Sequence, residues 1–186
     1  MPTKYFKEPG PGNTEETMKA VIKTAEEQGI QDIVVASTSG RTAEYLMGKG
    51  YRVTVVTHQA GYKEAGSMEI SEEMREKLIG DGMNVLTTTH LLGGADRALN
   101  YKFGGIYPAE IIAHSLRMLG QGMKVCVEVA TMAMDAGHLP AGREIISVGG
   151  SGKGADTAVV IVPAHSQYLF DTDIREIICM PRGHKK

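Results

Sequence analysis

The chain has 186 residues, of which 42% are hydrophobic and 23% charged, so it can bury a core and is neither disordered nor fibrous. The formal net charge of −2 excludes an overall basic field for nucleic acid or an anionic membrane, and the absence of Trp disfavours aromatic platforms for single strands. Glycine is in excess, with 23 residues or about 12%, against an average of about 7%. That excess indicates either flexible tails or ordered turns that approach a ligand closely.

The cysteine content and the N-terminal sequence indicate a cellular compartment. Cys126 and Cys179 are too few for the disulfide framework of a small secreted domain, and both lie in apolar runs. We expect two buried thiols in a reducing environment. Residues 1–12 contain no apolar stretch of signal-peptide length, and no segment approaches 18 consecutive apolar residues. The expectation is therefore a soluble cytoplasmic protein with no membrane segment.

The first half of the chain alternates between helical and strand patterns. Residues 1–12 are rich in Pro and Gly and are expected to form an extended arm, after which Asn13 and Glu16 are typical of a capping box. Ser71 is expected to cap a later helix. The patterns predict, in order, a helix over 13–28, a strand over 33–36, a helix over 42–48, a strand over 52–57, a helix over 71–78 and a strand over 84–89. This order predicts a parallel sheet with right-handed crossovers.

The second half contains one ambiguous segment. A helix is expected over 106–119, with Pro108 near its start. Residues 122–137 show both the alternating valines of a strand and the spacing of a helix face, and their length favours a buried helix. Strands are expected over 144–148, 157–162 and 176–180, before a basic tail over 181–186. Because only about eight residues separate the first two of these strands, they are expected to be antiparallel or to lie apart.

Together these elements predict a single α/β domain over residues 1–186, with three α/β/α layers and a mostly parallel, mixed sheet. In such a sheet the ligand crevice lies at the carboxyl ends of the strands. The first strand ends in a turn rich in hydroxyl groups, which opens the next predicted helix. Its amides would attract an anion and its arginine would add charge. The candidate phosphate-binding residues are Thr38, Ser39, Gly40, Arg41 and Thr42; the alternative is an ordinary helix cap with a surface arginine.

The next two strands also end in hydroxyl groups and histidines. Thr57 and His58 follow one strand, and Thr87 and His90 follow the other. If the strands are parallel, these residues converge on the same edge as Ser39, although each histidine alone is more often structural than catalytic. No cluster of His, Cys, Asp and Glu has metal-ligand spacing, so no structural metal is expected.

Glycines form two further candidate contacts. Gly150, Gly152 and Lys153 lie in a glycine-rich loop that a strand follows, which excludes a Rossmann pyrophosphate site, and no Ser or Thr follows the lysine as in a P-loop. The loop is then either a backbone anion nest or a loosened hairpin turn. Gly104 stands in another glycine break, before the Pro108 helix, and is compatible with a flat ligand pressed on the backbone.

Two stretches, Ile33–Ala43 and the following Arg52–Thr57, resemble the C-terminal α/β domain of pyruvate kinase, in which a T-x-S-G-[RK]-[ST] turn binds a sugar-phosphate effector. The whole chain further resembles small stand-alone archaeal proteins classed as pyruvate kinase C-terminal domain-like. Gly149–Ala158 and Ile178–Arg182 carry that likeness. The resemblance implies a mixed sheet between helix layers, without the barrel domain that carries pyruvate kinase chemistry.

The resemblance also implies that FMN can occupy the site, with no established reaction, and that Thr38–Thr42 holds the ligand phosphate. The first hypothesis is an FMN-binding protein, with a flavoprotein oxidoreductase as its enzymatic form. The alternative is a non-catalytic sensor or regulatory module for a sugar phosphate or another phosphometabolite. A hydrolase using His58 or His90 as a base lacks a supporting triad. The apolar helix over 122–137 is covered either by the domain itself or by a partner in a homo-oligomer.

Overall fold

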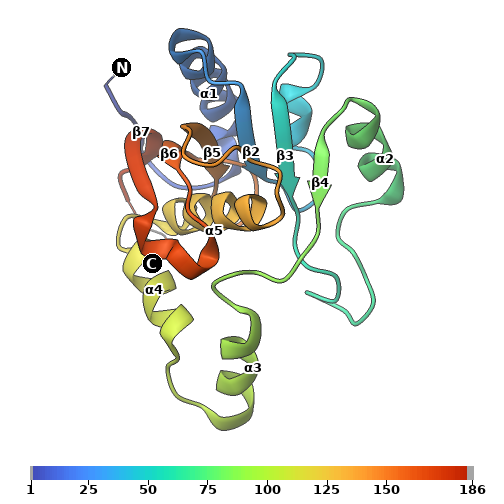
Figure 1. Ribbon diagram of the computed structural model, residues 1–186, viewed down its shortest axis with the longest axis vertical. Coiled ribbons are helices and arrows are strands. Elements are labelled where there is room, and N and C mark those ends of the chain that lie inside the picture. The colour runs from blue at the N-terminus through green and yellow to red at the C-terminus, as the bar shows by residue number, and fades with distance from the viewer. Residues whose placement is uncertain (1, 184–186) are drawn as a thin grey trace.

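The computed structural model describes residues 2–183, and their centre is a seven-stranded sheet (Figure 1). The strand order is β1-β7-β6-β5-β2-β3-β4. The strands are β1 (Lys4–Phe6), β2 (Asp32–Ala36), β3 (Arg52–Val56), β4 (Asn84–Leu86), β5 (Ile145–Gly149), β6 (Thr157–Val162) and β7 (Asp173–Pro181). The α-helices are α1 (Thr14–Gln28), α2 (Glu72–Gly80), α3 (Gly94–Phe103), α4 (Pro108–Arg117) and α5 (Gln121–Asp135).

Six of the seven strands are parallel, and β6 alone among them runs the other way. β2 pairs in parallel with both β3 and β5, whereas β6 is antiparallel to both β5 and β7. The predicted antiparallel pair and mixed sheet are therefore confirmed. The parallel strands all end at one edge of the sheet, which we call the carboxyl edge. In Figure 1 the arrowheads of β3 and β4 point toward the side on which α3 and α4 lie.

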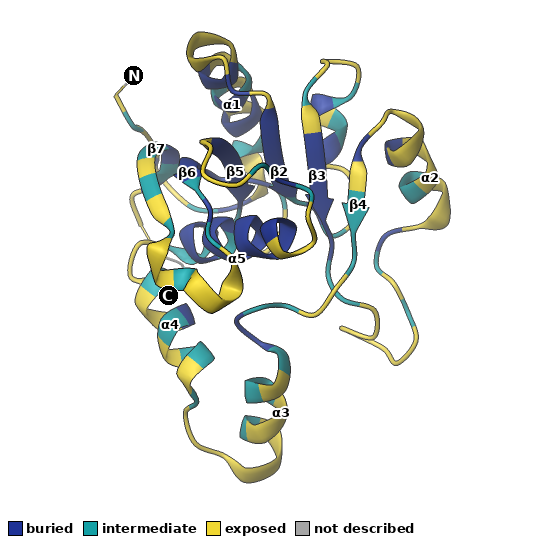
Figure 2. Cartoon of the chain, viewed as in Figure 1, coloured by how far each residue is buried: buried dark blue, intermediate teal, exposed yellow. Residues whose placement is uncertain are grey.

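Two apolar cores separate three layers. Ile33 and Val35 of β2 pack on the side of α1 and α2, whereas Val34 between them packs on the side of α5. This alternation explains why the strand has no polar face: both of its faces are covered. Figure 2 shows the central strands and α5 almost entirely buried. The predicted three-layer α/β/α fold is confirmed.

The segment over 122–137, whose sequence pattern was ambiguous, forms most of helix α5. This helix spans fifteen residues, of which twelve are buried within this chain, so the domain itself covers the helix. The valines alternate because the helix packs on almost every side. Cys126 of α5 and Cys179 of β7 are buried free thiols, and burial raises the pKa of Cys179 to about 11, which leaves it protonated and inert.

The expected N-terminal arm is partly a strand. Lys4–Phe6 forms β1 and pairs with the last strand, where Lys4 faces Cys179. The capping box was also wrong: Asn13 ends a short 3₁₀ turn, and its side-chain amide donates to the Glu8 carbonyl at 2.8 Å. Ser71 does cap α2, since its hydroxyl accepts from the Met74 amide at 3.2 Å.

Four other expectations differ from the structure. The helix expected over 42–48 is a four-residue 3₁₀ helix, Ala43–Leu46, and the strand expected over 84–89 ends at Leu86. Helix α3 was not predicted, and none of its residues is buried. The last strand begins earlier than expected and includes Pro181, so the basic tail does not begin there, and residues 184–186 lie outside the described residues. No helix within residues 2–183 is long and apolar enough to cross a membrane.

Candidate functional site

The turn after β2, residues 38–42, presents several polar groups at the carboxyl edge. Among the described residues, the amides of Thr38, Ser39 and Arg41 have no hydrogen-bond partner, and neither do the Thr38 and Ser39 hydroxyls. Ser39 and Arg41 are exposed, and the Arg41 guanidinium makes no ion pair with the described part of the chain. Consecutive free amides beside a cation form a concave site for an anion.

Internal contacts fix the shape of this turn. The buried Ser37 hydroxyl accepts from the Thr42 amide at 3.1 Å, and Gly40 has a φ of +84°. A Cβ on Gly40 would lie 2.3 Å from Cγ of Met74 in α2, so this glycine is also required by helix packing. The short 3₁₀ helix that follows offers no helix dipole of useful length. Any anion bound here depends on the free amides, the two hydroxyls and Arg41.

The ends of β3 and β4 meet through hydroxyl groups and rings. The Thr57 and Thr87 hydroxyls lie 2.6 Å apart. The His58 ring lies 4.2 Å from the Tyr62 ring and 5.2 Å from the His90 ring, measured between centroids. The predicted convergence of these two strand ends is thus present in the structure.

His58 is oriented by a carboxylate that sequence reasoning did not identify. Its Nδ1 lies 2.5 Å from Oε2 of Glu69, and an ionised carboxylate can only accept, so this hydrogen bond requires a proton on Nδ1. Partial burial acts to raise the pKa of Glu69, but hydrogen bonds from Lys63 and His58 outweigh it and hold that pKa below its usual value. A histidine held in one tautomer by a carboxylate is suited to accept a proton at Nε2.

A buried ion pair lies behind this cluster. Lys124 and Glu128, one turn apart on α5, are 6% and 5% exposed and are bonded to each other. Glu128 also accepts from the Leu92 amide at 2.8 Å, which fixes the loop after His90 on α5. Burial lowers the pKa of Lys124, although Glu128 opposes that effect, and Arg117 and Arg97 lower it further. Burial likewise lowers the pKa of His90. The cationic groups of Arg97 in α3, Arg117 in α4 and Lys124 in α5 therefore lie close enough for their charges to interact.

The glycine-rich loop after β5 is closed by an internal carboxylate. Asp156 is fully buried, and its Oδ2 accepts from the amides of Gly10 at 2.9 Å and Ser151 at 3.2 Å. Its Oδ1 accepts from the Thr157 hydroxyl at 2.8 Å. A Cβ on Gly150 would lie 2.2 Å from the Gly154 carbonyl oxygen, so the loop folds tightly on itself. The Asp156 carboxylate thus occupies the position in which the glycine-rich loop was expected to bind an anion.

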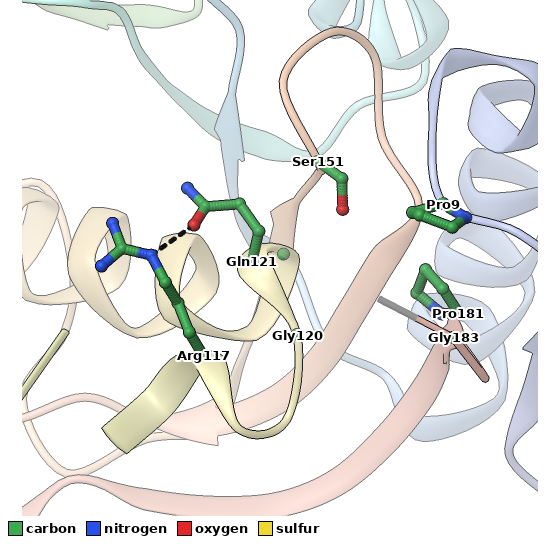
Figure 3. Close-up of a pocket in the computed structure, with 8 residues that line it drawn as sticks. Pro9, Arg117, Gly120, Gln121, Ser151, Pro181 and Gly183 are labelled. Atoms are coloured by element: carbon green, nitrogen blue, oxygen red, sulfur yellow. Dashed lines mark hydrogen bonds between the residues drawn. The ribbon is translucent and has the colours of Figure 1, made fainter. Parts of the chain in front are cut away.

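One cavity of about 250 Å³ lies beside this loop (Figure 3). Ser151 of the loop lines it, as do Pro9 and Pro181, which lie together in Figure 3 on the side away from Arg117 and Gln121. At the α4–α5 junction, Arg117 donates from Nε to Oε1 of Gln121 at 2.7 Å. Of the predicted loop residues, Gly152 and Lys153 are exposed and do not line this cavity.

The predicted site residues fall into three groups. Thr38–Thr42, Thr57, His58 and Thr87 lie together at the ends of the adjacent strands β2, β3 and β4. Gly150, Gly152 and Lys153 lie at the same edge but past β5, in the loop that Asp156 closes. Gly104 lies elsewhere: it ends α3, in a hairpin that contacts the rest of the fold through the packing of α4 on α5.

Sequence reasoning missed Glu69, Arg97 and the Lys124–Glu128 pair. Glu69 lies in a loop of no regular pattern, and Arg97 is on the helix that was not predicted. The ion pair had a visible signal, because a Lys and a Glu at i,i+4 interrupt an otherwise apolar helix face. Charged residues within a pattern of apolar residues were therefore the sequence signal that indicated a functional site.

One comparison with known proteins bears on this arrangement. A family model described as pyruvate kinase, alpha/beta domain, matches residues 15–161, more than three quarters of the chain. The matched range extends from α1 into β6 and includes the turn after β2, the His58 cluster, the buried ion pair and the glycine-rich loop. β1 and β7 lie outside it.

Proposed function

We propose that this chain, which belongs to the pyruvate kinase α/β-domain family, binds a phosphorylated small molecule at the carboxyl edge of its sheet. The phosphate would bind to the turn Thr38–Thr42. The observation that carries the proposal is that, within residues 2–183, the amides of Thr38, Ser39 and Arg41, two hydroxyls and the Arg41 guanidinium have no partner. A phosphate has enough acceptor oxygens to satisfy all of these donors.

The turn is a better phosphate site than the glycine-rich loop. In that loop, the Ser151 amide already donates to Asp156, so it is not free to donate to a bound phosphate. No carboxylate among the described residues is bonded to the Thr38–Thr42 turn. The proposal therefore assigns the phosphate to the end of β2.

FMN is the first ligand to test. Its phosphate would bind to the turn, and the rings of His58 and Tyr62, on the adjacent strand end, offer aromatic surface for a flat ring system. FMN would supply the redox chemistry of a flavoprotein oxidoreductase, while this chain's residues bind and orient it. The turn fits the phosphate group, and the aromatic cluster supports the choice of FMN.

A sugar phosphate is the second candidate, with a non-catalytic sensor or regulatory module as the function. The hydroxyls of Thr57 and Thr87, bonded to each other at the ends of β3 and β4, are suited to exchange hydrogen bonds with sugar hydroxyls. In this case the Thr38–Thr42 turn would still hold the phosphate.

The absorbance spectrum of the freshly purified protein separates the two candidates. Bound FMN gives a flavin spectrum, and added FMN loses fluorescence as it binds. If the protein is colourless and leaves the fluorescence of added FMN unchanged, FMN is excluded as the ligand. Stabilisation by sugar phosphates, measured as a Tm shift that grows with ligand concentration, would then support the sensor.

The position of the phosphate is tested by the double variant Ser39→Ala with Arg41→Gln. The variant removes one hydroxyl and one charge, and we expect the Kd of FMN or sugar phosphate to rise about tenfold or more. Lys49→Gln is the matched control, because it removes an exposed charge just beyond the 3₁₀ helix. An unchanged Kd in the double variant would move the phosphate away from this turn.

A further inference from the structure

A second cavity, of about 240 Å³, lies between the loop after β4 and the helices α3 and α4. Its charged and polar lining comes from Arg97 of α3 and from Glu110, His114 and Arg117 of α4, and Leu92 and Gly93 close it at the loop. Pockets for drug-sized ligands are usually about 300 Å³ or larger, so this one fits only a small group.

Two half-buried arginines line this cavity without an acidic partner among residues 2–183. Arg97 lies over the Tyr62 ring at 5.6 Å, and a Cβ on Gly93 would lie 3.2 Å from its Nη2, so the glycine leaves space for the guanidinium. The Nε of Arg117 donates to Gln121, as Figure 3 shows, and its Nη groups have no partner in the described chain. A guanidinium group without an acidic partner has charged donors available to an anion.

The acidic groups nearby are already engaged. Glu110 accepts from the Tyr107 amide at 3.1 Å in a capping box, and Asp96 accepts from the Ala109 amide at 2.7 Å. Glu128 is bonded to Lys124 and to the Leu92 amide. Arg97 and Arg117 both lower the pKa of the buried Lys124, which places all three cations in one positive field. None of these carboxylates is paired with Arg97 or Arg117 in the described chain.

We propose that this cavity is a second anion site, in which Arg97 and Arg117 bind an oxyanion, the carboxylate or phosphate group of a small metabolite. Two guanidinium groups provide planar donor pairs that match the oxygen geometry of either group. The site is separate from the Thr38–Thr42 turn, and it shares no residue with it. It does not depend on the identity of the ligand bound there.

The test uses the full chain carrying Ser39→Ala and Arg41→Gln, so that anion binding at the turn is weakened. Orthophosphate and malonate are titrated separately, and the Kd and the rise in Tm are measured. We expect one or both anions to bind; a response to orthophosphate alone identifies a phosphate site, and a response to malonate alone identifies a carboxylate site. Adding Arg97→Gln or Arg117→Gln should raise the Kd about tenfold or more. Lys102→Gln, the control on α3, should leave it unchanged.

Protection from chemical modification provides a second test of the proposed anion site, made on the protein without substitutions. Phenylglyoxal reacts with accessible guanidinium groups, and the bound anion should slow modification of Arg97 and Arg117, measured by peptide mass mapping, while Arg143 reacts at an unchanged rate. Absence of binding by both anions, or equal Kd values in the Arg97→Gln and Arg117→Gln proteins and their parent, would overturn the proposal. Failure of the Thr38–Thr42 assignment would instead appear as unchanged FMN or sugar-phosphate binding in the parent double variant.

Discussion

The carboxyl edge has two halves that look alike in sequence and differ in structure. In the closed half, past β5 and β7, the glycine-rich loop is bonded to the buried Asp156 and packed against the N-terminal segment. In the open half, past β2, β3 and β4, the turn Thr38–Thr42 leaves the amides of Thr38, Ser39 and Arg41 and the Arg41 guanidinium without partners in the described chain. Both halves contain glycine, hydroxyl groups and a cation.

The difference shows that glycine content does not identify a ligand site. Gly150 is required because the Gly154 carbonyl oxygen occupies the space of a side chain, and Gly122 is required because Thr157 does so. The distinguishing feature is whether the polar backbone groups have partners within the chain. By this criterion the open half is the one that we propose binds the ligand.

The largest expected effect is in the closed half, where Asp156→Ala removes the acceptor for three donors. Two amides and the Thr157 hydroxyl would be left unsatisfied in the interior, so we expect a loss of about 3 kcal/mol in the free energy of unfolding. Urea denaturation measures it. Asp156→Asn keeps one acceptor and should lose less, and the exposed Asp171→Ala is the control. A loss as small as that of the control would show that Asp156 does not close this loop.

A second substitution tests whether packing requires glycine in the same loop. Gly150→Ala places a Cβ 2.2 Å from a backbone oxygen, and we expect a loss of about 2 kcal/mol in the same measurement. Gly12→Ala is the control, because that position has neither a close neighbour nor a positive φ. Equal stability of the two variants would mean that the loop relaxes freely.

The third prediction, with a smaller effect, concerns the pH dependence of the free energy of unfolding. It depends on His90, which lies in the open half. Burial lowers the pKa of His90 below 6.5, so the unfolded chain binds this proton more readily than the folded one. The stability contributed by neutral His90 is complete above about pH 6.5 and decreases as the pH falls from there toward the folded pKa. Thermal unfolding at several pH values should show a shallower acid decline for His90→Gln. An identical decline in both proteins would contradict burial of a neutral His90.

The smallest effect is expected for Ser39→Ala with Arg41→Gln. Because both side chains are exposed and without partners in the described chain, the free energy of unfolding should change by less than about 0.5 kcal/mol. The same urea experiment measures it, beside Lys49→Gln. A loss as large as that of Gly150→Ala would show that the turn is held by internal contacts, as the closed half is.

Sequence alone predicted most elements and the fold class, because both rest on local patterns. Apolar runs such as Ile33–Ala36 identified buried strands, and the short connection before β6 excluded a parallel crossover, which left an antiparallel pair as one of two expected arrangements. Helix α3 was not predicted, and the structure buries none of its residues fully. The strand β1 was missed because three residues of a Pro- and Gly-rich arm become a strand only when β7 supplies the hydrogen bonds.

The sequence by itself determined that this is an α/β protein whose polar turns gather at one edge of a parallel sheet. Only the tertiary structure decided which of those turns are free. Asp156 satisfies Gly10, which lies 146 positions away in the chain, and Glu69 orients His58 from an irregular loop. Such pairings have no periodicity for a sequence pattern to reveal, because they depend on where the sheet brings distant segments together.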